Sequence, residues 1–225
     1  MLWSPHTQLH YPFQNTATDY SGNARNGTVN GSGAYATKPN GGRCLYFDGT
    51  GDSVSTPSFG LSGTVVVFAA WVRCKLLASD IQGILSDNAN SATVGFLWVR
   101  RPANANDLTW FYANGSAITP AGSPNFFADP FNDTWLHAVV VCDYSNKNCY
   151  FFRNATLVST VALTGTPEFP TTARVKYLGI FDSANYPLSD GYLADVYLGT
   201  LLTMPAAAQM LANAKRLMLG FNPIW

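Results

Sequence analysis

The sequence predicts an all-β protein: an antiparallel two-sheet jelly-roll sandwich that ends in one short helix and an apolar tail. Three observations indicate this class. Apolar runs of strand length recur along the chain, turn-forming residues separate them, and no helical periodicity occurs before residue 200. The runs are rich in β-branched and aromatic residues, which favour strands, and Asn, Gly, Asp, Ser or Pro closes nearly every one.

The expected strands follow one another between residues 43 and 200. They are RCLYFDG (43–49), VVVFAAWVRC (65–74), TVGFLWVRR (93–101), LTWFYANG (108–115), WLHAVVVCDY (135–144), NCYFFRN (148–154), TLVSTVAL (156–163), RVKYLGIFD (174–182) and GYLADVYLGT (191–200). The spacing of the turns within residues 142–158 predicts consecutive hairpins, which are typical of an antiparallel sandwich.

The one clear helical pattern lies near the C-terminal end. Apolar residues recur there at a spacing near 3.6: Ala207, Met210, Leu211, Ala214, Leu217 and Met218. Thr203 is expected to cap this helix and Pro205 to lie in its first turn. We therefore predict a jelly roll over residues 1–202, and a helix with an apolar tail over 203–225 that packs on the sandwich or on a partner.

The composition excludes several classes of function. Only 12% of the residues are charged, and 13 basic residues balance 13 acidic ones. Nucleic-acid binding needs a clustered basic surface, which this chain lacks. The longest apolar run, VVVFAAWV at 65–72, is too short to insert into a membrane, and MLWSPHTQLH at the start lacks the pattern of a signal peptide. A weakly charged surface favours a protein that is docked on others.

The four cysteines are Cys44, Cys74, Cys142 and Cys149, and none forms a CxxC motif, which speaks against zinc. Cys142 and Cys149 flank a turn and can face each other across a hairpin. A disulfide is therefore possible there, although buried free thiols are the expectation for a chain without a secretion signal.

The polar run TDYSGNARNGTVNG, residues 18–31, does not fit a phosphate-binding glycine loop, because no helix and no Lys-Ser/Thr pair follows it. We expect it to lead the first strand into the second sheet. Together with five later motifs it resembles laminin-G-like domains of the concanavalin A-like jelly-roll superfamily. Those motifs are GRCLYFDGTGDSV (42–54), AAWVR (69–73), WLHAVVVCDYSNKNCYFFRN (135–154), GYLADVYLG (191–199) and LLTMPAAAQML (201–211).

The resemblance covers about residues 10–212 in the order usual for the family, with two departures. Ala155 follows Asn154 where the family prefers Gly, and Ala194 replaces the first Asp of the closing pair. Jelly-roll glucanases with this fold place two or three carboxylates along one strand. Here the only glutamate is Glu168, and no expected strand carries acidic residues at alternate positions. We therefore predict that the protein is not an enzyme.

The resemblance also implies a possible structural calcium ion between the N-terminal loop and the closing strand. The matching positions are Asp19, Asp48 and Asp195. Calcium takes six to eight oxygen ligands, so carboxylates from both segments would suit it. The alternative is that Asp19 and Asp48 cap their own turns through hydrogen bonds to the main chain.

Glycan binding on such folds uses exposed aromatic side chains with amides close by. The candidates are Trp98, Trp110, Tyr112 and Asn114, where the alternation of a strand places Trp110 and Tyr112 on one face. The alternative is that these rings fill the core between the sheets.

Fold, neutral composition and the absence of an export signal together predict a non-catalytic, lectin-like structural or adhesion component of a phage or similar virion, assembled in the host cytoplasm. Its partners would be other virion proteins or copies of itself, and host glycan is a further possible ligand. The apolar tail would supply assembly contacts through Phe221, Pro223, Ile224 and Trp225. The alternative is a free-standing soluble carbohydrate-binding protein, and a glycosidase with unrecognised residues is a third, weaker option.

Overall fold

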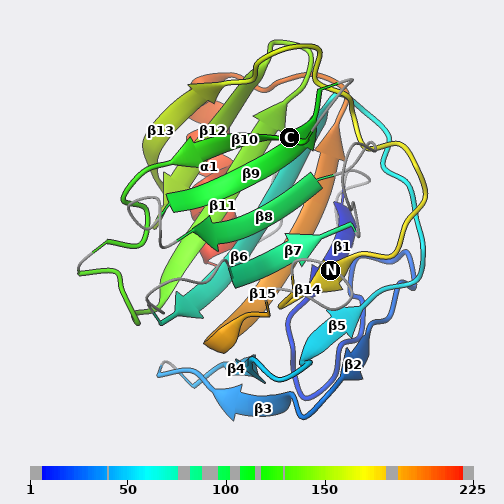
Figure 1. Cartoon of the computed structure of the whole chain (residues 1–225), viewed down its shortest axis with the longest axis vertical. Coiled ribbons are helices and arrows are strands. Elements are labelled where there is room, and N and C mark those ends of the chain that lie inside the picture. The colour runs from blue at the N-terminus through cyan, green and yellow to red at the C-terminus, as the bar shows by residue number, and fades with distance from the viewer. Residues whose placement is uncertain are drawn as a thin grey trace.

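The computed structural model describes residues 7–39, 41–75, 82–87, 96–101, 107–114, 118–128, 130–180 and 187–219, with the backbone alone for 96–101 and 118. Two antiparallel sheets pack face to face, as Figure 1 shows. The predicted all-β sandwich with one C-terminal helix is therefore confirmed. Among the described residues no helix is both long and apolar enough to cross a bilayer.

The larger sheet has eight strands among the described residues, in the order β13-β12-β11-β6-β15-β4-β3, and β1 also pairs with β15. Their bounds are β1 Thr7–Tyr11, β3 Ala34–Thr37, β4 Arg43–Asp48, β6 Val65–Cys74, β11 Leu136–Asp143, β12 Asn148–Arg153, β13 Thr156–Ala162 and β15 Ser189–Leu201. Along one edge of β15, β4 pairs with its first half and β1 with its second.

The smaller sheet has seven strands in the described part of the chain, in the order β10-β9-β8-β7-β14-β5-β2. Their bounds are β2 Thr28–Asn30, β5 Ser53–Ser55, β7 Gln82–Ser86, β8 Phe96–Arg101, β9 Asp107–Ala113, β10 Ile118–Ser123 and β14 Tyr177–Leu178. This sheet lies in front of the larger one in Figure 1.

Strand β6 shows how the sequence builds the core. Its side chains alternate between the two faces of the sheet, as in any strand. The even-numbered residues Val66, Phe68, Ala70 and Val72 belong to the apolar cluster between the sheets. Val65, Val67 and Ala69 alternate with them and belong to a second apolar cluster on the outer face.

Helix α1 (Ala207–Met218) covers that second cluster, on the side of the larger sheet away from the smaller one (Figure 1). Its buried residues Met210, Ala214 and Leu217 form one cluster with outward residues of β6, β11, β12 and β15. The predicted apolar stripe is thus confirmed. The predicted cap at Thr203 is wrong: Ala206 precedes the first turn and provides no side-chain hydrogen bond, because the helix begins after Pro205 rather than around it.

The polar run at 18–31 connects β1 of the larger sheet to β2 of the smaller one, as predicted. Asp19 organises this crossing. Its carboxylate accepts four hydrogen bonds from the loop and from β1, and the donors are His10 N, Ser21 N, Ser21 Oγ and Arg25 N. Asp19 thus accepts four of the hydrogen bonds that fix the loop, and Asn23, Arg25 and Asn26 form others.

Cys142 and Cys149 lie opposite each other in the register of the β11–β12 hairpin. Both are fully buried, as are Cys44 and Cys74, and all four are free thiols in this structure. Burial raises the pKa of Cys149 well above its usual value, with Cys142 as a further cause. These thiols therefore act as small apolar core residues.

We expect the free energy of unfolding to fall as the pH is lowered below 6.5, because buried His137 resists protonation. Burial, with a contribution from Lys38, lowers its pKa from 6.5 to about 3. Between these values the unfolded chain binds the extra proton, so each pH unit removes at most about 1.4 kcal/mol of stability for this group. Urea unfolding across this range measures the slope, and His137→Gln should flatten it. An equal slope in the variant would contradict this role of His137.

Candidate functional site

Four half-buried aromatic side chains lie on the part of the larger sheet that α1 leaves open. They are Tyr46 on β4, Trp71 on β6, Tyr192 on β15 and Trp135 immediately before β11. We call these four residues the aromatic patch. They point outward because each alternates with core residues of its own strand, or, for Trp135, directly precedes one.

The strand register brings the rings together. Tyr46 is the cross-strand partner of Tyr192, and their ring centroids are 4.8 Å apart. The ring centroids of Tyr192 and Trp135 are 5.9 Å apart. Trp71 lies opposite His137, whose buried ring it contacts edge-on at 5.4 Å. The patch therefore extends across four neighbouring strands.

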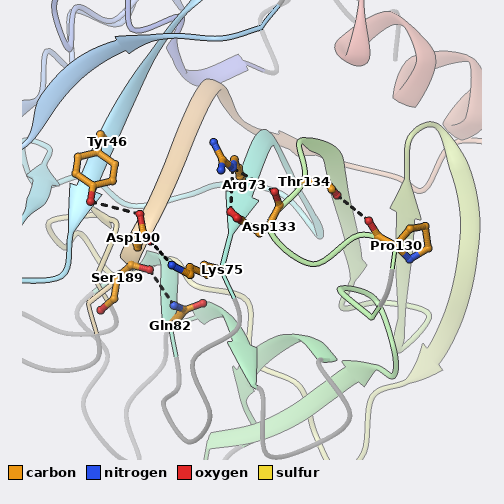
Figure 2. A network of polar contacts seen from close by, with 9 residues as sticks. All are labelled: Tyr46, Arg73, Lys75, Gln82, Pro130, Asp133, Thr134, Ser189 and Asp190. Carbon is orange, nitrogen blue, oxygen red and sulfur yellow. Dashed lines mark hydrogen bonds and ion pairs between the residues drawn. The ribbon is translucent and has the colours of Figure 1, made fainter.

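Charged groups lie beside Tyr46 of the patch, and Figure 2 shows the contacts of Asp190 with Tyr46 and Lys75. Asp190 accepts hydrogen bonds from Lys75 at 3.0 Å and from the Tyr46 hydroxyl at 3.4 Å. Burial and the neighbouring Asp190 raise the pKa of Tyr46. The Lys75–Asp190 pair is about half exposed, so it adds little stability and its atoms face solvent.

Arg73 is a further charged residue beside the rings. Its Nε donates to Asp133 Oδ1 at 2.9 Å, and the bond raises the pKa of Arg73. Its guanidinium carbon lies 5.2 Å from the centroid of the Tyr192 ring, a cation–π distance. The arginine is thus held in place by Asp133 and by the Tyr192 ring.

A third ion pair lies beside the two tryptophans of the patch. Lys38 Nζ lies 2.7 Å from Asp195 Oδ2, and both side chains are largely buried. Lys38 and Pro39 close a hollow of about 200 Å³ against Trp71 and Trp135. Two indole rings and the lysine therefore line one small concavity, and the lysine is paired with Asp195.

The predicted glycan-binding rings lie elsewhere. Trp110 and Tyr112 are buried in the core between the sheets, where the Trp110 Nε1 donates to Tyr144 Oη at 3.3 Å. Their burial contradicts the prediction that they stack on a sugar and agrees with the core alternative. Asn114 is half-buried and donates to Thr119 Oγ1 at 2.7 Å. Trp98 pairs with Trp110 in the register, and its side chain lies outside the described part of the structure.

The three carboxylates predicted to bind calcium do not converge. Asp19 caps its loop, Asp195 pairs with Lys38, and Asp48 accepts from Thr50 N and Ser32 Oγ. In the described ranges no three His, Cys, Asp or Glu side chains come together in a way that could hold a metal ion. These residues therefore do not fit the calcium site that the resemblance implies. The tail residues Phe221, Pro223, Ile224 and Trp225 lie outside the described residues.

Comparison with known families identifies the fold. Residues 48–201 match the Laminin_G_3 model, described as the concanavalin A-like lectin/glucanases superfamily. The chain belongs to this superfamily. The family resemblance inferred from the sequence motifs is thereby confirmed. No curated protein sequence matches the chain.

Solved structures of the superfamily fold are similar to this chain at low identity. Domain 4 of AbnA, an extracellular GH43 arabinanase from Geobacillus stearothermophilus solved with arabinotriose, has a TM-score of 0.71 and 16% identity; the match covers 94% of this chain and 97% of that one. The receptor-binding domain of botulinum neurotoxin D has a TM-score of 0.69 and 10% identity, over 95% of this chain and 53% of that one.

A third structure comes from botulinum neurotoxin type C, whose cell entry is described as dependent on interaction with two ganglioside molecules. It has a TM-score of 0.65 and 14% identity, over 94% of this chain and 51% of that one. The chain thus spans about half the length of the toxin binding domains. At these identities the similarity establishes the fold.

We expect calcium to leave the stability of the chain unchanged, because the three candidate carboxylates are bonded to different partners. A chelator should leave the melting temperature unchanged. Asp19→Ala should lower the free energy of unfolding by about 2 to 4 kcal/mol, with or without calcium, since several hydrogen bonds of the crossing loop are lost. Differential scanning calorimetry measures both effects. A melting temperature that rises on adding calcium would show that the ion is bound.

Proposed function

We propose that this domain is a non-catalytic carbohydrate-binding module and that the aromatic patch is its binding surface. The observation that carries the proposal is the set of four half-buried rings with ion-paired side chains beside them. Aromatic faces accept the C–H faces of sugars, while Arg73, Lys38, Asp190 and Asp195 can bond the hydroxyl groups around them. The superfamily membership and the arabinotriose bound by the similar arabinanase domain support the proposal.

The patch suits binding better than bond cleavage. A glycosidase of the usual kind needs a protonated carboxylic acid close to a second carboxylate. At the patch, Asp133, Asp190 and Asp195 are each held in an ion pair, with Arg73, Lys75 and Lys38 respectively. Each carboxylate of the patch thus has a cation as its partner rather than a second carboxylate, and it can accept a hydrogen bond from a sugar beside the aromatic surface.

Trp135→Ala should weaken binding of the preferred glycan by about tenfold or more, because one of the four rings on which a sugar can stack is lost. A glycan array that includes arabino-oligosaccharides and gangliosides selects the ligand, and titration calorimetry measures its affinity. Tyr20→Ala is the matched control, since Tyr20 is an aromatic residue that is 52% exposed outside the patch. Equal affinities of the wild type and Trp135→Ala would refute the patch as the site.

A second candidate function is assembly, in the form of a phage or similar virion component made in the host cytoplasm. The observation that favours it is an apolar groove of about 580 Å³ between α1 and the β12–β13 hairpin. Leu157 and Leu211 line it and are 47% and 36% exposed. We propose that this groove docks on neighbouring subunits, copies of this chain included, in such an assembly.

Leu157→Asp combined with Leu211→Asp should abolish any concentration-dependent self-association, because two carboxylates would be buried in the contact. Analytical ultracentrifugation over a range of concentrations provides the measurement. Leu202→Asp is the control, since Leu202 is 72% exposed and does not line the groove. A wild-type chain that stays monomeric throughout would exclude self-docking through the groove.

A further inference from the structure

A polar groove lies at the end of the smaller sheet, on the outer face of β2, β5 and β14. Its volume is about 530 Å³, within the range of ligand sites. Asn30, Ser53, Ser55 and Tyr177 line it from the strands. The register explains this grouping, because Asn30 pairs with Ser53 and Ser55 pairs with Tyr177.

The same strands turn their apolar residues the other way. Val54 and Leu178 alternate with the groove residues and are fully buried in the core. The groove is therefore built on paired strands that the core holds rigidly. Gly49 and Gly51, from the turn before β5, line it without side chains of their own, which leaves main-chain groups accessible.

The hydrogen bonds inside the groove determine which of its donors and acceptors a ligand can use. Asn30 Nδ2 donates to Ser53 Oγ and to Ser55 Oγ, both at 3.2 Å. Because each hydroxyl accepts from this amide, its own proton is available to another acceptor. No described residue donates to Asn30 Oδ1. The groove thus offers one fixed acceptor beside two fixed donors.

The groove carries no charge on the residues that line it. Two carboxylates lie next to the lining glycines in the sequence, and neither lines the groove. Asp52 is buried and accepts from Ser32 N and Asp48 N, and the exposed Asp48 accepts from Thr50 N and Ser32 Oγ. A charged ligand would therefore lose hydration without gaining an ion pair. The ring of Tyr177, with Ile180 and Pro187, supplies apolar surface beside the hydroxyls. A molecule that fits has many hydroxyl groups, no charge and an apolar face.

We infer that this groove is a second binding site, specific for an uncharged sugar. It lies on the outer face of the smaller sheet, whereas the aromatic patch lies on the outer face of the larger one. The two sites share no residue. The groove inference therefore does not rest on the patch proposal, and either site can fail without the other.

Chemical-shift mapping on the full chain tests the inference, with glucose, galactose and arabinose as neutral probes and glucuronic acid and N-acetylneuraminic acid as charged ones. At least one neutral sugar should shift the side-chain amide of Asn30 and the main-chain amides of Ser55 and Tyr177. Asn30→Ala should weaken the binding of that sugar by about tenfold or more. The substitution removes the acceptor Oδ1 and releases the hydroxyls of Ser53 and Ser55 from their hydrogen bonds to the amide.

Two controls separate the groove from the rest of the molecule. Asn148→Ala removes an amide of the larger sheet that bonds only Asn146 O in its own turn, and it should leave the groove shifts unchanged. Trp135→Ala removes part of the patch and should also leave them unchanged. Absence of groove shifts with every neutral sugar, tighter binding of a charged sugar, or equal affinity in Asn30→Ala would each overturn the inference.

Discussion

The position of α1 on the larger sheet is the constraint on which the exposed surface of this protein depends. Strand β6 is apolar on both faces, so its outward side chains need cover as much as its inward ones. Met210, Ala214 and Leu217 of the helix supply that cover over Val65 and Val67. Beyond Ala69 the cover ends, and the outward row of the same sheet continues as half-buried aromatic side chains. One helix thus divides a single sheet face into a packed half and an open half.

The sequence was sufficient to predict the sandwich, many of its strands, the crossing loop and the apolar stripe of the helix, because these depend on local alternation and turn chemistry. It did not predict β3, β5, β7 or β10. It was not sufficient to locate the aromatic patch. VVVFAAWVRC is a nearly continuous apolar run, so periodicity alone shows no exposed face. Trp71 and Trp110 both lie in strands, and only tertiary packing places one beside solvent and the other between the sheets.

The carboxylates show that the sequence is also insufficient to predict the contacts of polar residues. Residue type and family resemblance suggested that Asp19, Asp48 and Asp195 could share an ion. Each instead has a nearer partner that the sequence does not reveal: main-chain amides of its own loop for Asp19, and a lysine 157 positions away for Asp195. A carboxylate surrounded by donors is already stabilised, and recruiting it to a metal would break those bonds. The partners of a side chain therefore decide its role more than its identity does.

Both proposed binding surfaces consist of side chains fixed on paired strands, so little conformational entropy is lost when a ligand binds. Shallow surfaces of this kind still give modest affinity, because a sugar exchanges hydrogen bonds to water for hydrogen bonds to protein. Two such surfaces on different faces raise the combined affinity for an object that is coated with glycans. Once one site is occupied, the local sugar concentration at the other rises, and the combined affinity can exceed either alone without a new contact. A rigid sandwich with sites on both sheets would therefore bridge glycan chains more effectively than it would hold a single chain.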